Sequence, residues 1–310
     1  MYARMRQETE GQETSKERSK SQQFSTENAY ASRDKNNILL YHKIEDKWEW
    51  GITRQRISQF EKQMKFLYKQ GYKLMRLDLS GQEKNFTNDF DSENKKIFLT
   101  FDDGYESVYT HAFPILEKFG FSATVFLITG WVGKKNLWDI NWGKKFNHLS
   151  WSQIEELKKF GFNFGSHTVN HPDLTKLNEK EVEYELLNSK NMIEDRLGER
   201  VEFLSYPFGK YNKLVQRIAE DIGYKNAFTI CSGPKKFFDP YALGRLGIYL
   251  FDSSLTLHIK LNQTPIFWIE DMKGRIINQF ANGTILFKSK PKYDFCLKSE
   301  KPKSIFVKKV

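Results

Sequence analysis

An apolar run that ends in two adjacent carboxylates constrains this chain more than any other segment. Residues 97–101 read IFLTF and are followed directly by Asp102, Asp103 and Gly104. An apolar run of this length, bounded by a glycine turn, is typical of a central strand of a parallel sheet. Open catalytic sites commonly lie where such strands end. The segment therefore predicts a buried strand whose C-terminal end presents a pair of acids.

A second motif supplies two imidazoles. His167 and His171 are four residues apart, and Pro172 follows them. The residue before a proline is pushed out of the helical region, so the motif predicts a single turn that holds both rings on one side. Two histidines and one carboxylate would leave a divalent cation with an open position for water, and the second carboxylate would be the general base. The spacing permits either aspartate to be the ligand.

Each of these motifs has a simpler interpretation when it stands alone. Asp-Asp-Gly is commonly a solvated turn, and a single His-x-x-x-His is commonly a pair of surface or core histidines. The combination of both motifs in one chain favours the metal site.

Predicted strands and helices alternate along the middle of the chain. The predicted helices span residues 54–70, 107–119, 150–161 and 178–197, and the predicted strands span 97–101, 123–128, 201–205, 227–230 and 243–248. Ser150 with Gln153, and Asn178 with Glu181, have the spacing of capping boxes. This alternation favours an α/β fold with a parallel sheet closed or nearly closed into a barrel.

The composition agrees with one catalytic domain between two tails. Hydrophobic residues make up 39% and aromatic residues 15% of the 310 residues, which is ample for a core. No window approaches the roughly 20 apolar residues that cross a bilayer. We expect residues 1–37 to be a disordered polar leader, or a start downstream of a lost export signal, because they lack an apolar h-region. Residues 38–263 would form the domain, and 264–310 a basic extension that could supply a last strand through residues 285–287.

The net charge and the cysteines exclude few classes of partner or cellular compartment. A net charge of +10 suits a polyanionic polymer or a membrane surface, but the excess is concentrated in residues 288–309, which favours a generic basic surface. Nucleic-acid binding is disfavoured because no recognisable binding module is present. Cys231 and Cys296 are expected to be reduced and structural, and they leave the compartment and the oligomeric state open.

The motifs resemble those of a known family. Residues 100–104 (TFDDG), 166–171 (SHTVNH) and 205–209 (SYPFG) are similar, in order and spacing, to the first three motifs of the polysaccharide deacetylases, carbohydrate esterase family 4. The sequence around residues 41–43 and 53–71 resembles that of the family branch that includes the poly-N-acetylglucosamine deacetylases. The resemblance covers about residues 38–263.

This resemblance implies a fold and roles for the site residues. The fold would be a distorted (β/α) barrel of seven or eight mostly parallel strands, with the site at the strand C-termini. Asp102 would be the general base, and Asp103, His167 and His171 would hold one divalent metal. Zinc suits these ligands best, although cobalt, nickel or iron would also be accepted. The main-chain N–H of Phe208, the aromatic residue after the motif proline, would hold the oxyanion.

The chain departs from the family pattern in two places. The family commonly carries an arginine where this chain has Ser205, and Arg245 resembles an arginine of the poly-N-acetylglucosamine branch that could supply the missing cation from another strand. A surface salt bridge is the alternative for Arg245. The family's final Leu-x-His, whose histidine is the general acid, has no clean match, and His258 is a weak candidate.

Other histidines and tryptophans have simpler interpretations. His111 is expected on a helix surface and His148 in a solvated loop, whereas His42, at the end of a first strand, could face the site. Trp131, Trp138 and Trp142 lie in a loop-rich segment, where they could stack on sugar rings or cap the core.

The sequence therefore predicts a metal-dependent deacetylase that hydrolyses N-acetyl groups of an amino-sugar polymer or glycoconjugate. One alternative is a deacetylase or deformylase of a lipid-linked sugar, which a basic tail would help to recruit to an anionic surface. Another is a carbohydrate-binding protein with weak catalysis, suggested by the missing final histidine.

Overall fold

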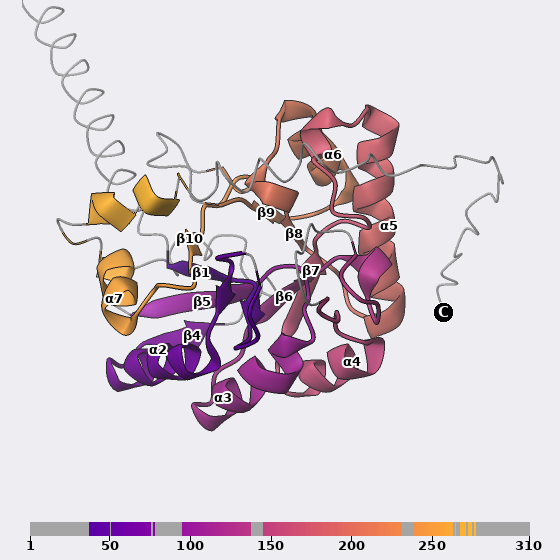
Figure 1. Cartoon of the computed structure of the whole chain (residues 1–310). Helices are drawn as coiled ribbons and strands as arrows, with labels where there is room; N and C mark the ends of the chain where they lie inside the picture. Colours follow the sequence, from indigo (N-terminus) through magenta and orange to yellow (C-terminus); the bar gives the residue numbers. More distant parts are fainter. Residues whose placement is uncertain are drawn as a thin grey trace, which may run out of the picture.

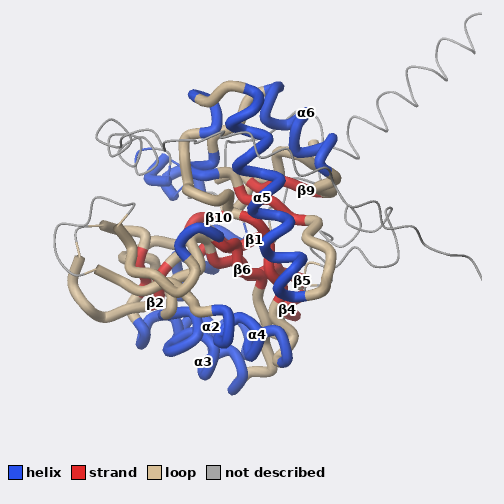
Figure 2. Tube along the Cα trace, turned by 90° about the vertical axis from the view of Figure 1, so that its right-hand side faces the viewer, coloured by secondary structure: helices blue, strands red, loops and turns tan. Residues whose placement is uncertain are grey.

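The architecture is a curled parallel sheet with helices on its outside (Figures 1 and 2). The computed structural model describes residues 37–49, 51–75, 77, 95–137, 145–230, 239–262, 264, 267–270, 272–274 and 276. The strands of the main sheet are β1 (Ile38–Tyr41), β4 (Lys73–Met75), β5 (Lys96–Phe101), β6 (Thr124–Leu127), β7 (Asn163–Ser166), β8 (Phe203–Ser205), β9 (Asn226–Phe228) and β10 (Leu246–Gly247). Their order is β10-β1-β5-β6-β7-β8-β9, and β4 also pairs with β5.

The two ends of this sheet come together. Phe228 of β9 forms a parallel bridge with Leu243, three residues before β10 begins, and Thr229 N donates to the Leu243 carbonyl at 2.8 Å. Because β10 itself pairs with β1, the strands form a nearly closed ring. The predicted distorted barrel of seven or eight mostly parallel strands is confirmed, and the described sheet has eight.

Helices cover the outside of the ring. They are α2 (Ile57–Lys69), α3 (Phe113–Lys118), α4 (Trp151–Lys159), α5 (Glu179–Leu197), α6 (Lys213–Ile222) and α7 (Ser254–Asn262), with short turns η2 (Val108–Ala112), η3 (Thr129–Trp131), η4 (Leu174–Lys176) and η5 (Pro207–Gly209). In Figure 1, α2, α3 and α4 lie along one side, and α5 and α6 lie on another. Both predicted capping boxes, at Ser150 and Asn178, are present.

Two predicted helices differ at their starts. The helix expected from residue 54 begins at Ile57, because β3 (Arg54–Gln55) pairs with β2 (Lys43–Ile44) in a separate two-stranded sheet. The helix expected over residues 107–119 is a π-helical turn, η2, followed by α3. Pro114 lies in the first turn of α3 and has no N–H to donate to the preceding turn, which favours the wider π geometry there.

Alternation along the strands divides the apolar residues into two groups. On the inside of the ring, a small cluster contains Phe98, Phe126, Phe203 and Phe228. Their strand neighbours, such as Leu99 of β5, belong to the larger core beneath the helices. Since successive side chains point to opposite faces of a strand, residues two positions beyond the inner phenylalanines also face inward. Two of these positions, Thr100 and Ser205, place hydroxyl groups at the C-terminal end of the ring interior.

The last residue of the expected leader contacts the main sheet. Asn37, which was expected in the leader, is buried, and its carbonyl accepts a hydrogen bond from Phe98 N at 2.8 Å. The expected leader before it, the predicted strand at 285–287, the basic tail, both cysteines, Trp138 and Trp142 all lie outside the described residues. Within the described residues, every helix is too short or too polar to cross a membrane.

Candidate metal and catalytic site

The two aspartates after β5 point in different directions. Asp102 continues the inward alternation of Phe98 and Thr100, and its N–H donates to the Tyr41 carbonyl of β1 at 3.0 Å. Asp103 has a φ of 70°, in the left-handed region that non-glycine residues rarely adopt. This change in backbone direction turns the second carboxylate away from the ring interior and towards the next loops of the sheet.

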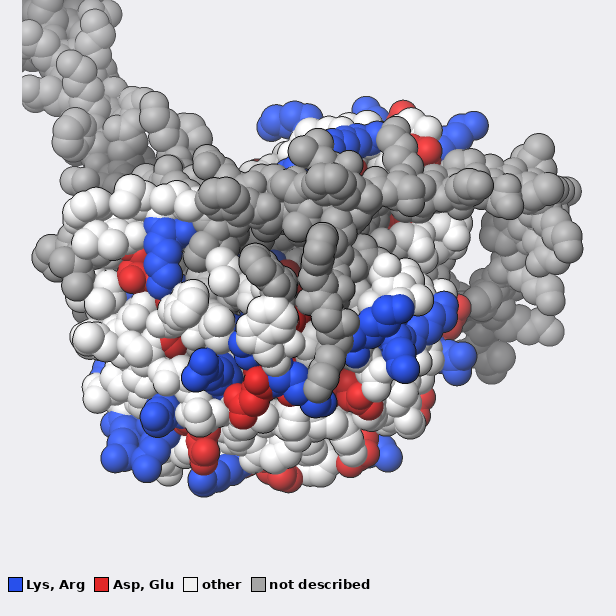
Figure 3. All heavy atoms as spheres, in the orientation of Figure 1, with Lys and Arg blue, Asp and Glu red and all other residues white. Residues whose placement is uncertain are grey.

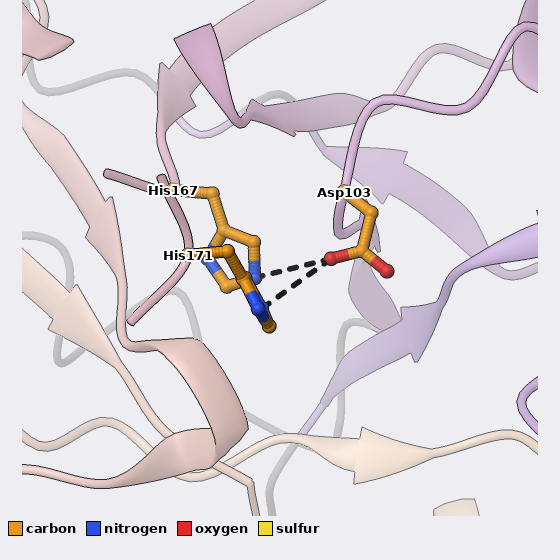
Figure 4. A group of neighbouring side chains, drawn as sticks. All are labelled: Asp103, His167 and His171. Atoms are coloured by element: carbon orange, nitrogen blue, oxygen red, sulfur yellow. Dashed lines mark ion pairs between the residues drawn. The ribbon is translucent and has the colours of Figure 1, made fainter. Parts of the chain in front are cut away.

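Asp103 meets both histidines of the second motif (Figure 4). Its Oδ1 lies 3.4 Å from His167 Nε2 and 3.6 Å from His171 Nε2. All three side chains are buried, and their candidate ligand atoms lie within 4.8 Å of one another. Ligands on a tetrahedral zinc, with bonds of about 2.0 to 2.1 Å, stand about 3.3 Å apart. The donor set therefore fits a divalent cation, and the aspartate grouped with the histidines is Asp103.

The hydrogen bond on the far side of one ring supports this fit. His167 Nδ1 lies 2.7 Å from the Ser205 carbonyl, to which it can only donate. The Nε2 atom of the same ring is then the unprotonated nitrogen that a metal requires. The β8 backbone thus fixes the tautomer and the orientation of His167.

The charges of the cluster stabilise one another. Burial by itself would raise the pKa of Asp103, but the His167 hydrogen bond and the nearby His171 hold the pKa well below its usual range. Burial lowers the pKa of His167, and the charges of Asp102 and Asp103 more than offset this, so its pKa is raised. Asp103 is therefore ionised, and its buried negative charge favours a cation beside it.

Asp102 forms a bidentate pair with Arg245. The guanidinium donates from one terminal nitrogen to Asp102 Oδ1 at 2.8 Å and from the other to Oδ2 at 2.7 Å. Its remaining donors reach Thr100 Oγ1 at 3.3 Å, Ser205 Oγ at 2.8 Å and the Thr229 carbonyl at 3.3 Å. All five N–H groups of Arg245 therefore have acceptors, and the Ser205 hydroxyl donates to Asp102 Oδ2 at 3.0 Å.

Arg245 is buried inside the ring and not on the surface. Its side chain has no exposed area, and its guanidinium lies 5.4 Å from the Phe126 ring centre and 5.8 Å from that of Phe228. Burial by itself would raise the pKa of Asp102, but the Arg245 charge and the neighbouring imidazoles outweigh it and lower the pKa. Asp102 is therefore ionised over a wide pH range.

Phe208 lies beside the metal cluster. It follows Pro207 in η5, has a φ of 59°, and places its ring 4.6 Å from that of His171 in an edge-to-face contact. A left-handed conformation at a phenylalanine is strained, and such strain is typical of functional turns. The loop after β8 thus places the main chain of Phe208 next to the turn that contains His167 and His171.

The structure brings His42 to the site and leaves His258 apart. His42 follows β1 and continues the inward alternation of Ile38, and its buried Nδ1 has no hydrogen-bond partner among the described residues. Burial lowers the pKa of His42, and the charges of Asp103 and Asp102 act in the opposite direction. His258 instead lies on α7, exposed, with its ring edge-on to Phe66 at 5.9 Å.

The prediction for His148 was wrong. Its side chain is buried, its Nδ1 lies 2.8 Å from the Asp103 carbonyl, and its ring stacks on Tyr105 at 5.0 Å. Trp131 lies 6.5 Å from the same ring, whereas His111 is partly exposed in η2. The polar residues around His148 conceal its burial in the sequence, because the loop that contains it folds back over the start of η2.

Comparisons with known proteins agree with this geometry. Residues 90–227 match the polysaccharide deacetylase family model. Bacillus subtilis YxkH, named as a polysaccharide deacetylase, is 31% identical over 194 residues, which is 62% of this chain and 63% of YxkH. A Staphylococcus aureus protein named poly-beta-1,6-N-acetyl-D-glucosamine N-deacetylase is 26% identical over 182 residues, 56% of this chain and 60% of that protein.

A solved structure matches as well. The Streptococcus pyogenes deacetylase PplD, in complex with acetate, superposes with a TM-score of 0.63 at 26% identity and covers 72% of this chain and 96% of its own. The chain is therefore similar to polysaccharide deacetylases in both sequence and fold. It spans about three fifths of the length of the two curated relatives.

The ligand geometry leads to a prediction for metal content. Alanine at Asp103, His167 or His171 leaves two protein ligands, so each variant should lose its metal on dialysis. Metal per chain is measured by plasma mass spectrometry after loading with Zn²⁺. His111→Ala, a histidine outside the cluster, should keep the wild-type content. Stoichiometric metal in His171→Ala would contradict this ligand set.

The Arg245 pair leads to a prediction for pH dependence. The guanidinium lowers the pKa of Asp102, so Arg245→Ala should raise it and move the acidic limb of the kcat/KM profile up by about 1 to 3 pH units. Arg245→Lys should restore part of the turnover, because an ammonium supplies charge without the planar fork. The control is Arg217→Ala, which removes an exposed ion pair between α6 and α5. An unmoved acidic limb in both Arg245 variants would mean that the pair is only structural.

Proposed function

We propose that this protein is a metal-dependent hydrolase that removes N-acetyl groups from an amino-sugar polymer or glycoconjugate. The observation that carries the proposal is the three-ligand cluster of Asp103, His167 and His171 beside an ionised carboxylate, Asp102. The match of residues 90–227 to the polysaccharide deacetylase family model, and the similarity to a poly-beta-1,6-N-acetyl-D-glucosamine N-deacetylase, support hydrolysis of a carbohydrate N-acetyl group. Zinc is the proposed cation, and cobalt, nickel and iron suit the same ligands.

The residues have separate tasks in the proposed reaction. A divalent cation at the cluster would polarise the amide carbonyl and lower the pKa of a bound water. Asp102 would accept the proton of the attacking water, and its pair with Arg245 keeps it ionised and fixes its orientation. The main-chain N–H of Phe208 would donate to the oxyanion, a role that does not depend on the side chain.

The leaving amine requires a proton before the C–N bond can break. His42 is proposed as its donor, because the ring lies at the C-terminal end of β1 within the field of both aspartates. A lowered pKa makes a protonated imidazole a stronger acid, so a proton on this ring is readily released. His258, the donor that the sequence suggested, instead contacts Phe66 of α2 and Asn262 of α7.

The substrate, the other partners and the domain boundaries are also part of the proposal. The N-acetylated glycan is the one partner that the family supports. On the face drawn in Figure 3, basic and acidic side chains are interspersed among the described residues. A contact between the basic tail and an anionic surface, and the boundaries at residues 37 and 263, are further parts of the proposal.

Two alternative functions predict different results in one assay. Acetate release is measured from an acetylated chito-oligosaccharide and from a lipid-linked N-acetylated sugar, each with Zn²⁺ or Co²⁺. Acetate release from the lipid-linked sugar alone would favour the lipid-directed deacetylase. Glycan binding without turnover of either substrate would favour the carbohydrate-binding protein.

Asp102→Asn tests the proposed base. The amide keeps the shape of the carboxylate but cannot accept the proton, so turnover should fall by about 10² to 10⁴ while the metal remains. Acetate release and metal content are measured on the same sample. Loss of the metal together with activity would mean that Asp102 and Asp103 have exchanged roles.

His42→Gln tests the proposed proton donor. Turnover of the N-acetyl glycan should fall by about 10² to 10⁴, whereas 4-nitrophenyl acetate, whose leaving group needs no proton, should be cleaved at a rate near that of the wild type. Asp102→Asn should lose both activities, and His111→Gln should lose neither. Equal losses of amide and ester cleavage in His42→Gln would contradict the role of donor.

A further inference from the structure

The turn that carries both histidine ligands has an unfavourable backbone. Thr168 has a φ of 69° and His171 a φ of 58°, so two of its residues are in the left-handed region without being glycine. Such conformations persist only where the surroundings hold them in place. The groups that hold this turn therefore decide where His167 and His171 point.

Backbone N–H groups of η3 hold one side of the turn. Thr129 N donates to the Thr168 carbonyl at 3.1 Å, and Gly130 N donates to the Val169 carbonyl at 2.9 Å. A Cβ at position 130 would lie 2.6 Å from the Val169 oxygen, so only glycine permits this approach. These contacts hold the carbonyls of the turn and leave its N–H groups to be satisfied elsewhere.

A buried carboxylate of α5 takes those N–H groups. Glu185 Oε2 accepts from Val169 N at 2.8 Å and from Asn170 N at 2.9 Å, and Glu185 Oε1 accepts from the Asn170 side-chain amide at 2.8 Å. Glu185 has no exposed area. Hydrogen bonds to an ionised acceptor are stronger than those between neutral groups. All three donors lie between the two histidine ligands.

The same face of α5 holds the start of the turn. Ser189, one helical turn after Glu185 and equally buried, accepts from Ser166 Oγ at 2.8 Å, and that oxygen accepts from Thr168 N at 3.2 Å. The helix therefore contacts the turn at two successive positions.

We infer that Glu185 is a positioning residue of the metal site: its carboxylate holds the Val169 and Asn170 N–H groups and so fixes the separation and orientation of His167 and His171. The inference rests on the proposed metal site. Both carboxylate oxygens accept, and a glutamine has one accepting oxygen and one donating nitrogen. Glu185→Gln must therefore lose either the hydrogen bonds from the two backbone N–H groups or the hydrogen bond from the Asn170 side-chain amide.

The test measures metal affinity separately from folding and activity. Co²⁺ and Zn²⁺ affinities are determined by chelator competition for the wild type, for Glu185→Gln and for Glu183→Gln, which changes an exposed carboxylate of the same helix. Groups that orient metal ligands typically contribute about 10- to 100-fold in affinity. Glu185→Gln should bind both metals at least about 10-fold more weakly, and Glu183→Gln should match the wild type.

Thermal unfolding distinguishes positioning from general stabilisation. If Glu185 positions the ligands, Glu185→Gln should show a smaller rise in Tm on addition of Zn²⁺ than the wild type at equal concentration. A lower metal-free Tm with an unchanged metal Kd would overturn the inference. If Glu185→Gln does not fold, Asn170→Ala, which removes one of the three bonds, decides in the same assay: weaker metal binding supports the inference and a wild-type Kd overturns it.

Failure of this inference is separable from failure of the proposed function. Metal Kd values need no substrate, so a wild-type protein that binds metal without releasing acetate would count against the deacetylase proposal alone. An active wild type together with a Glu185→Gln variant of unchanged metal Kd would count against the positioning role alone.

Discussion

A buried guanidinium connects the closure of the sheet to its chemistry. Arg245 precedes the last strand, Asp102 follows β5 and Ser205 ends β8, so these side chains meet only when the sheet has curled. Because Arg245 has no exposed area, each of its N–H groups needs an acceptor inside the ring. Removing one partner of such a pair commonly costs about 3 to 5 kcal/mol. The interaction that orients the proposed base is therefore also one on which the fold depends.

Backbone strain is concentrated around the same site. Among the described residues, five non-glycine positions have positive φ, and four of them lie in the site: Asp103, Thr168, His171 and Phe208. Each follows the C-terminal end of a parallel strand, where the chain must turn out of the sheet while its side chain stays at the centre. The surrounding hydrogen bonds from β6, β8 and α5 hold these turns, which is the condition under which strained conformations persist.

Ser205 shows how a change in sequence can leave the electrostatics of a site intact. Its hydroxyl accepts from Arg245 and donates to Asp102, in the place where the family commonly has an arginine. The small side chain leaves room for a guanidinium that arrives from another strand, between Phe126 and Phe228. The carboxylate keeps a bidentate cation, and the charge that lowers its pKa comes from a different position in the chain.

Local patterns determined much of this protein. The apolar run before Asp102 and the two capping boxes each act over a few residues, so the strands and helices they belong to could be predicted from the sequence. The barrel followed from strand and helix alternation together with the family resemblance. Which aspartate joins the histidines could not be derived from the spacing, because it depends on a left-handed backbone at Asp103.

Only the tertiary structure decided the remaining contacts, because they join residues far apart in the chain. Arg245 and Asp102 are separated by 143 positions, and nothing local distinguishes a buried arginine from an exposed one. The burial of His148 and of Glu185 was hidden for the same reason, since each becomes enclosed only when another element packs over it. His42 gave a clearer signal, the inward alternation of β1, but the charges it faces come from β5 and from the segment before β10. Sequence thus determined the elements and the chemical groups at their ends, and the closing of the sheet determined which of those groups meet.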